Sequence, residues 1–262
     1  MSTRLIPLGT NGFIPTQGRH TMSFLALVDD QAILLDTGTG AARLLSEPLA
    51  GMLQSYPALS IIYSHYHLDH TVGLTYFTAI WPSKPLTIYA PERPLLHASA
   101  LETLNALISP PNFPITLDHF PCPVTIVPLH GDHLQIGSVS VRLRPQKHAG
   151  GSVGIRLGDD IAYTTDTVVD EGSIDFVRGV KLLLHELWLD DADAPAEEAT
   201  RSGHSYASGV AQIATKAGVG SLMIVHHHPR RILAEIERTA QACQSQTTAT
   251  IIVPEEGKVY DI

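Results

Sequence analysis

Cysteine is scarce in this chain of 262 residues, which contains only Cys122 and Cys243. The two lie far apart in the sequence, and neither belongs to a C-x-x-C pair. This usage does not favour a disulfide framework or a cysteine metal site. We expect both side chains to be buried thiols.

Long hydrophobic runs and an excess of basic charge are also missing. No apolar run approaches the length of a membrane span, and residues 1–7 lack the apolar core of a signal peptide. The 26 acidic residues outnumber the 17 basic ones, which gives a formal net charge of −9. We therefore expect a soluble cytoplasmic protein with no membrane partner and no strong nucleic-acid-binding patch.

The chain has the composition of a globular protein, with 44% hydrophobic and 16% charged residues. Strands followed by helices fill two successive halves without a linker between them, which predicts one domain over residues 1–262. The expected fold class is α/β (α+β), with two sheets sandwiched between helices. Expected strands cover residues 4–8, 24–28, 32–35, 61–63, 86–89, 124–127, 134–136, 139–143, 153–157, 161–165, 181–184, 222–225 and 250–253.

Expected helices start near Ala41 and cover residues 71–80, 91–108, 207–217 and 230–243. In the last of these, the helical period places five residues on one buried face: Ile232, Leu233, Ile236, Ala240 and Cys243. Five prolines in residues 109–123 predict an irregular segment. The acidic residues Asp190, Asp191 and Asp193 are expected to form a solvated loop.

Four potential metal ligands follow the apolar run 61–63 within six positions: His65, His67, Asp69 and His70. Side chains of an extended segment repeat every two residues, so His65 and His67 would leave the strand on the same side. Asp69 and His70 come after the turn, and their side chains would point to a position a few ångströms beyond the one that His65 and His67 share. This arrangement predicts two adjacent divalent ions. Imidazoles and carboxylates suit zinc, and manganese or iron is also compatible. The alternative is an exposed polar loop.

A two-metal site needs further ligands, and three residues stand where strands are expected to end: His148, Asp166 and His226. A carboxylate at the position of Asp166 could bridge both ions. Asp36 follows another expected strand, and it either caps a helix or orients a metal ligand from behind. His20, His97, His119, His130 and His133 lack ligand spacing and are expected to be surface or loop histidines.

Several motifs occur together in order along nearly the whole chain. They are Leu8-Gly9-Thr10-Asn11-Gly12 with Pro15 and Arg19, the H-x-H-x-D-H stretch, His185-Glu186-Leu187-Trp188, Gly203-His204-Ser205 and residues 224–230. In these the sequence resembles the metallo-β-lactamase superfamily, and most closely its ribonuclease Z branch with the related phosphodiesterases. The corresponding segments of that branch read H-E-A-T-F, G-H-S-T and L-T-H-F-S-P-R.

The resemblance implies a four-layer αββα sandwich and a divided ligand set. One ion would be held by His65, His67 and His148, the other by Asp69, His70 and His226, with Asp166 between them. Asp69 counts among the catalytic residues as well. His204 would be the proton donor to the leaving group, steadied by Glu186. Without the resemblance, His204 could cap a helix that starts near Tyr206, and Glu186 could be a strand-end ion-pair partner.

Two departures from the ribonuclease Z pattern affect the prediction. The long arm that grips tRNA is absent, because residues 155–157 lead to Asp166 through only a tight turn at residues 158–160. His227 and His228 replace the expected Phe-Ser, so the identity of the ligating imidazole is open, with His226 favoured by its place at a strand end. The resemblance also makes a homodimer plausible.

The predicted function is a dinuclear metal-dependent hydrolase that cleaves small phosphodiesters or short RNA ends by a metal-bound hydroxide, with His204 as proton donor. One alternative keeps the metals and changes the substrate to a lactone, thioester or other carbonyl compound such as a β-lactam. A second alternative is a non-catalytic metal-binding domain.

Overall fold

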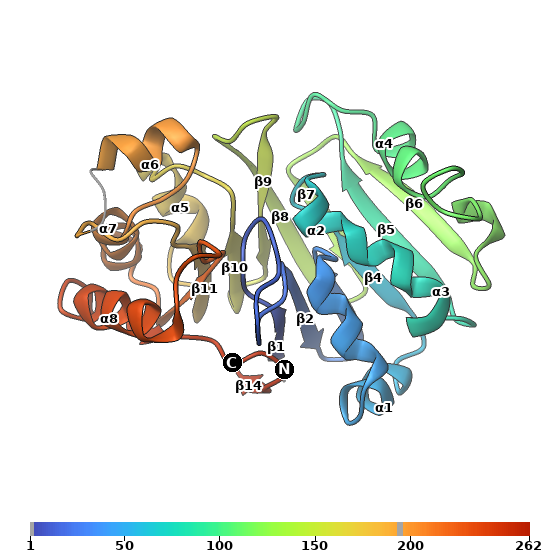
Figure 1. The fold of residues 1–262 in the computed structure, drawn as a ribbon, viewed down its shortest axis with the longest axis horizontal. Helices are drawn as coiled ribbons and strands as arrows, with labels where there is room; N and C mark the ends of the chain where they lie inside the picture. The colour runs from blue at the N-terminus through green and yellow to red at the C-terminus, as the bar shows by residue number, and fades with distance from the viewer. Residues whose placement is uncertain (1–2, 193–195) are drawn as a thin grey trace.

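Two seven-stranded mixed sheets lie face to face, with helices on both outer surfaces, in a computed structural model that describes residues 3–192 and 196–262 (Figure 1). This arrangement confirms the expected four-layer αββα sandwich. The first sheet has the order β14 (Tyr260–Asp261), β1 (Thr3–Gly9), β2 (Ser23–Val28), β3 (Gln31–Leu35), β4 (Leu59–Ile62), β5 (Leu86–Pro91) and β6 (Val124–Leu129).

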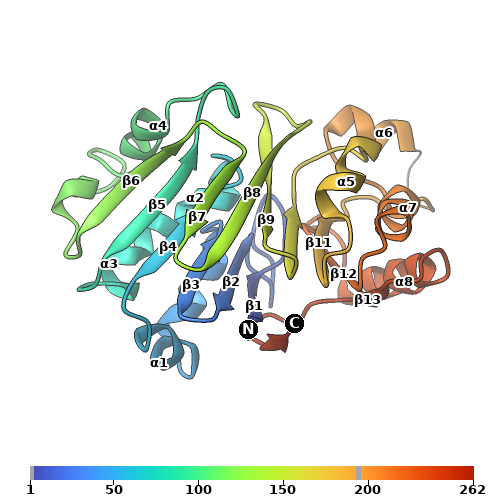
Figure 2. The same cartoon turned by 180° about the vertical axis from the view of Figure 1, so that it is seen from behind.

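The second sheet comes from the second half of the chain, as the view from behind shows (Figure 2). Its order is β13 (Thr250–Ile252), β12 (Ser221–Val225), β11 (Leu182–Glu186), β10 (Ile161–Thr164), β9 (Ser152–Leu157), β8 (Val139–Gln146) and β7 (His133–Ile136). Strands β3 to β6 are parallel, and so are β10 to β13. The carboxyl ends of each parallel set therefore lie at one edge of its sheet.

Short helices cover the two outer faces. Those of the first half are the 3₁₀ helix η1 (Thr39–Leu45), α1 (Leu49–Gln54), α2 (Leu68–Thr71), η2 (Val72–Tyr76), α3 (Phe77–Ile80), α4 (Ala100–Leu107) and η3 (Leu117–His119). Those of the second half are η4 (Glu171–Ser173), α5 (Ile174–Val177), α6 (Ala196–Ser202), α7 (Ala207–Ala217) and α8 (Leu233–Gln244). None of the helices in the described ranges has the length and apolar character needed to cross a bilayer.

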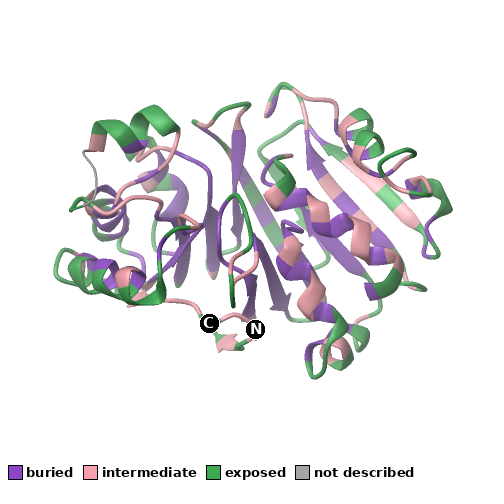
Figure 3. Cartoon of the chain, viewed as in Figure 1, coloured by how far each residue is buried: buried purple, intermediate pink, exposed green. Residues whose placement is uncertain are grey.

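Three apolar clusters hold the layers together, and the central strands are buried on both faces (Figure 3). The middle cluster lies between the sheets and includes Phe24, Ile33 and Tyr163. The outer clusters join each sheet to its own helices. One includes Leu34 of β3 and Phe77 of α3, and the other includes Leu222 of β12 and Ile213 of α7. Because side chains alternate along a strand, one strand supplies residues to two clusters.

The predicted helix over residues 91–108 was wrong in its bounds. Strand β5 extends to Pro91, and only residues 100–107 of the expected helix 91–108 are helical. The residue before Pro94 is disfavoured in helical conformation, and α4 begins where Ser99 accepts a hydrogen bond from the Glu102 amide. The helix predicted near Ala41 is present as the 3₁₀ helix η1. Residues 71–80 are helical as predicted, but they are divided among α2, η2 and α3.

The division of residues 71–80 has a local cause at Gly73. Its amide donates to the Thr37 carbonyl at 2.7 Å, and a Cβ there would lie 2.3 Å from the Gly38 carbonyl oxygen. This close approach fixes the segment against the backbone that follows β3, and a regular α-helix is interrupted there.

The predicted buried face of α8 was partly wrong. Ile236, Ala240 and Cys243 are buried, but Ile232 and Leu233 are exposed. The helix begins only at Leu233, with the Glu235 carboxylate accepting a hydrogen bond from the Ile232 amide at 3.0 Å. Ile232 and Leu233 line a surface cavity instead of packing in the core.

The predicted acidic loop is only partly solvated. Asp190 faces the largely buried Arg231 guanidinium at 3.3 Å and accepts a hydrogen bond from Thr239, because a buried cation requires a carboxylate partner. Asp191 is exposed and accepts a hydrogen bond from the Ser208 amide at the start of α7. Asp193 lies outside the described residues.

The predictions for the two cysteines and for the five histidines without ligand spacing are confirmed. Both cysteines are buried and free. His97, His119, His130 and His133 are exposed, whereas His20 is half-buried in a loop.

Glu256, near the end of the chain, holds the loop between β1 and β2. Its carboxylate accepts hydrogen bonds from the amide of Thr10 at 2.9 Å and from the amide of His20 at 3.1 Å. It also pairs with Arg43 at 2.8 Å. One buried carboxylate thus fixes both ends of residues 10–20, which we call the first loop.

Candidate metal centre

Strand β4 ends in the His cluster at one edge of the first sheet. The imidazoles of His65 and His67 leave this segment close together, with ring centroids 4.5 Å apart. His67 has extended backbone and precedes α2, which then contains Asp69 and His70. The strand-to-helix transition expected from the sequence therefore brings all four side chains to one place.

The second sheet delivers three more side chains to the same place. His148 follows β8, Asp166 follows β10 and His226 follows β12. Asp166 and His226 have φ angles of 51° and 54°, in the left-handed region, which is uncommon for residues other than glycine. Strained backbone conformations of this kind cluster at functional sites, where the surrounding structure maintains them.

The carboxylate of Asp166 lies between two groups of nitrogen atoms. Its Oδ1 is 3.3 Å from Nε2 of His148 and 3.9 Å from Nε2 of His65. Its Oδ2 is 3.0 Å from Nε2 of His70 and 3.3 Å from Nε2 of His226. Each oxygen thus faces a different set of imidazoles.

Two clusters of donor atoms result, each with its atoms within 4.8 Å of one another. One comprises His65, His67, His148 and Asp166, and the other Asp69, His70 and His226. A further group of Asp166, His204 and His226 overlaps with them. The structure thereby brings all seven predicted ligands together.

The donor atoms fit a divalent cation. Nε2 of His65, His70 and His226 is buried and has no hydrogen-bond partner. A buried polar atom without a partner is rare and costly, and metal ions bound in the two clusters would satisfy these three nitrogens. Imidazole and carboxylate donors suit zinc, manganese or iron.

The charges of the cluster agree with this interpretation. Burial lowers the pKa of His65 and His67, which favours the neutral, ligating imidazole. Burial alone would raise the pKa of Asp166, but the surrounding imidazoles lower it well below its usual range. Burial opposes protonation of His226, yet Asp166 and Asp69 raise its pKa to about 10. The carboxylates therefore favour positive charge between them.

Asp36 supports the cluster from behind. Its Oδ2 lies 2.7 Å from Nδ1 of His70 and accepts a hydrogen bond from the Tyr163 hydroxyl at 2.7 Å. Its Oδ1 accepts from the Ser64 amide at 2.7 Å. The residue that precedes η1 is Gly38, so the capping interpretation was wrong. Asp36 orients the His70 ring so that Nε2 faces Asp166.

Glu186 and His204 form a pair beside the cluster. His204 Nδ1 is 2.8 Å from Glu186 Oε2, and the Thr167 amide donates to the other carboxylate oxygen. The indole of Trp188 stacks on the His204 ring, with centroids 4.4 Å apart and planes at 16°. Tyr206, not His204, precedes α7, so the alternative of a helix cap was wrong.

Of the three consecutive histidines, only His226 has a ring nitrogen in the described donor clusters. His227 is buried elsewhere, where burial and then Arg19 lower its pKa to about 3. His228 is half-buried against the edge of Trp188. The preference for the strand-end position therefore agrees with the geometry.

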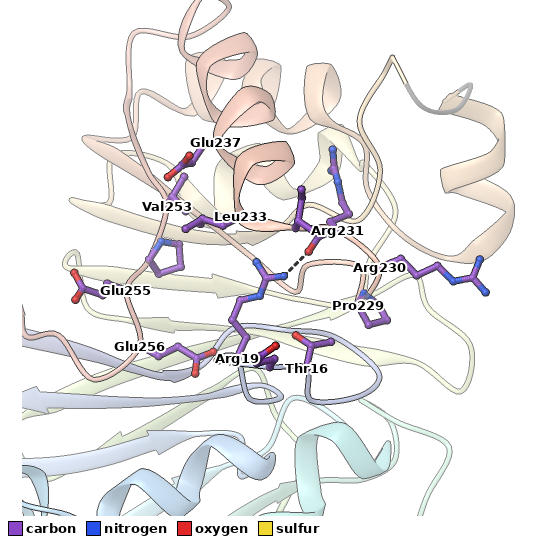
Figure 4. A pocket seen from close by; sticks show the side chains of 14 residues that line it. Thr16, Arg19, Pro229, Arg230, Arg231, Leu233, Glu237, Val253, Glu255 and Glu256 are labelled. Atoms are coloured by element: carbon purple, nitrogen blue, oxygen red, sulfur yellow. Dashed lines mark hydrogen bonds between the residues drawn. The ribbon is translucent and has the colours of Figure 1, made fainter.

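A cavity of about 200 Å³ opens over the donor atoms. Its lining contains two aromatic residues that the sequence did not single out, Phe13 and Trp188. Trp188 could have been noticed because it stands in H-E-L-W where the resemblance has H-E-A-T. Phe13 carried no such signal. A larger cavity of about 710 Å³ is lined by the other end of the first loop, where Arg19 donates to the Arg231 carbonyl (Figure 4).

Comparison with known proteins agrees with this geometry. A family model described as "Beta-lactamase superfamily domain" matches residues 31–227. Ribonuclease Z from Methanosarcina mazei is 27% identical over 85% of this chain and 87% of its own length. Ribonuclease Z from Natronomonas pharaonis is 24% identical, with 100% of this chain and 98% of that protein covered.

Solved structures share the fold at lower identity. The metallo-β-lactamase fold protein YhfI from Bacillus subtilis aligns over 100% of both chains with a TM-score of 0.77 and 20% identity. Human tRNase Z, short form, aligns over 98% of both chains with a TM-score of 0.67 and 21% identity. Because the matched family model spans most of the sequence, the chain belongs to the metallo-β-lactamase superfamily of metal-dependent hydrolases and is a relative of ribonuclease Z.

Proposed function

We propose that this protein is a dinuclear metal-dependent phosphodiesterase. One ion would be held by His65, His67 and His148, and the other by Asp69, His70 and His226. The observation that carries the proposal is the position of Asp166, whose two oxygens face the two imidazole sets at 3.3 Å and 3.0 Å. Zinc fits the donors, as do manganese and iron.

Two divalent ions, when bound, supply Lewis acidity and lower the pKa of water from its bulk value to near neutral. Asp69 has a carboxylate in the cavity, 3.5 Å from His70 Nε2 and 3.6 Å from His226 Nε2. We assign it both to the ligand set and to the orientation of the attacking water. Its neighbours hold it ionised, because His70 lowers its pKa below the usual range although burial acts in the opposite direction.

His204 is proposed to donate the proton to the leaving alkoxide. Its Nδ1 is engaged by Glu186, which leaves Nε2 as the nitrogen that can present a proton to the cavity. Glu186 is buried and fixed by the Thr167 amide, so it orients the imidazole for proton donation. Trp188 covers one face of the ring and limits its rotation.

Small phosphodiesters and short RNA ends are the proposed substrates. Strands β9 and β10 are joined by residues 158–160 alone, and Gly158 turns the chain with a φ of 53°. This connection leaves no arm with which to grip a folded tRNA. The cavity of about 200 Å³ and the net charge of −9 also favour a compact substrate.

The proposal is tested by loading the protein separately with zinc, manganese and iron and assaying it on four substrates: bis(p-nitrophenyl) phosphate, a lactone, a thioester and a β-lactam. We expect metal-dependent hydrolysis of the phosphodiester, with a lower kcat/KM for the carbonyl substrates. Turnover confined to carbonyl substrates would contradict it. Two bound metals without turnover of any substrate would identify a non-catalytic domain.

Asp36→Asn is expected to weaken metal binding about 10- to 100-fold. The amide that replaces one carboxylate oxygen cannot accept both the His70 and the Tyr163 hydrogen bonds, so the imidazole loses its fixed orientation. Competition with a chromophoric chelator measures the affinity. Asp30→Asn, in the exposed turn between β2 and β3, is the matched control. Equal affinities in the two variants would show that Asp36 does not support the metal site.

A further inference from the structure

Phe13 is a large aromatic side chain placed in the open at the rim of the candidate metal centre. It is 69% exposed, and it lines the same cavity as His67, Asp69 and His204. Its φ is 66°, in the left-handed region, which a bulky residue adopts only at an energetic cost. An exposed apolar ring in a strained backbone conformation contributes little to a core, so another reason for its position is required.

The backbone that carries Phe13 is held directly against the centre. Its amide donates to Asp69 Oδ2 at 2.7 Å. The neighbouring Gly12 amide donates to the His227 carbonyl at 3.0 Å, and a Cβ at Gly12 would lie 2.3 Å from the His226 ring. Only glycine allows this approach, and the Phe13 ring is consequently presented at a fixed place.

The other end of the first loop is fixed as well. Thr16 and Arg19 exchange backbone hydrogen bonds at 2.8 and 3.1 Å. The Arg19 guanidinium crosses the larger cavity to the Arg231 carbonyl (Figure 4). The loop is therefore anchored at both ends, and Phe13 does not belong to a loosely tethered segment.

The size of the cavity determines what the ring can contact. About 200 Å³ is below the range of roughly 300–1,000 Å³ that holds a drug-sized ligand. It accommodates the phosphate group, and at least one ester substituent must then cross the rim. Phe13, which is 69% exposed, presents a large apolar side chain at that rim.

Trp188 lines the same cavity, but its ring surfaces are already in use. His204 stacks on it at 4.4 Å, and His228 approaches at 4.6 Å. Phe13 has no comparable ring contact in the described part of the chain. It is thus the aromatic surface of this cavity that is free to receive a ring from the substrate.

We propose that Phe13 determines specificity by stacking on a planar ring, a nucleobase, carried by the ester group that does not leave. This inference rests on the proposed phosphodiesterase activity and names its substrate class: nucleotidyl rather than alkyl phosphodiesters. Stacking of bases on aromatic side chains is tolerant of base identity, so a preference among the four bases is not expected.

The test compares two esters with the same leaving group, thymidine 5′-monophosphate p-nitrophenyl ester and methyl p-nitrophenyl phosphate. We expect Phe13→Ala to lower kcat/KM for the thymidine ester about tenfold more than for the methyl ester. Phe13→Tyr keeps a flat ring and should retain the preference, whereas Phe13→Leu keeps an apolar but non-planar side chain and should lose it. Leu101→Ala, at an exposed position of α4, is the control.

Binding supplies a readout independent of turnover. Calorimetric titration of the metal-loaded protein should give a Kd for thymidine 5′-monophosphate about tenfold weaker in Phe13→Ala than in the parent, with a smaller change for methyl phosphate. Equal losses for both ligands, or none, would overturn the inference. A parent protein that binds thymidine 5′-monophosphate with this dependence on Phe13 but hydrolyses neither ester would instead contradict the proposed function.

Discussion

Asp166→Ala is expected to remove both metal ions together and to lower hydrolysis by at least about 10³-fold. The side chain is buried, and each of its oxygens faces a different imidazole set, so its loss opens both clusters at once. Metal ions contribute several kcal/mol of transition-state stabilisation, and each 1.36 kcal/mol corresponds to about tenfold in rate. Metal content per chain, from mass spectrometry after desalting, is measured beside the rate on bis(p-nitrophenyl) phosphate.

Asp175→Ala is the matched control, because this carboxylate is exposed on the short helix α5, away from the cluster. Circular dichroism separates a loss of ligands from a loss of fold. If the Asp166 variant keeps both metals and its rate, Asp166 is not a bridging ligand. If it loses one metal only, the two sites are independent and the proposed shared carboxylate is wrong.

His204→Ala is expected to lower kcat about 10²- to 10⁴-fold on a substrate with an alkoxide leaving group, with metal content unchanged. A dinucleoside monophosphate is such a substrate, because its departing oxygen is strongly basic and needs a proton. The loss should be much smaller on p-nitrophenyl esters, whose leaving group departs readily as an anion. The ratio of the two effects therefore reports proton donation rather than general damage.

Metal analysis decides between two roles for His204. Its donor atoms also lie within 4.8 Å of those of Asp166 and His226, so a metal-ligand role is geometrically available. Loss of metal from His204→Ala would assign it to the ligands, and equal losses on both leaving groups would exclude proton donation. Glu186→Gln should reproduce the leaving-group dependence more weakly, and His119→Ala, at an exposed position, should change neither rate.

Several metal ligands of the candidate site could be predicted because they follow an apolar run that becomes a buried strand. His65, Asp166 and His226 follow β4, β10 and β12, and the ends of these strands meet at one place. The order of apolar runs is visible in the sequence, and the position of chemical groups just after them follows from it.

Features that depend on contacts between distant segments could not be predicted. Leu233 fits the apolar face of a helix, yet it is exposed, because α8 starts there and the side chain lines the larger cavity. Asp190 looks like a fully solvated residue, but it contacts Arg231 and Thr239 on other segments and is only partly exposed. The place of Phe13 follows from hydrogen bonds to Asp69 and His227, neither of which is local in sequence.

The carboxylate of Glu256 lies outside the metal centre but affects it through the first loop. It accepts hydrogen bonds from Thr10, 246 positions away, and from His20, 236 positions away, so a residue distant in sequence fixes the loop that presents Phe13. An enzyme whose substrate preference depends on that ring can thus be retuned through a residue that never approaches the reacting phosphate.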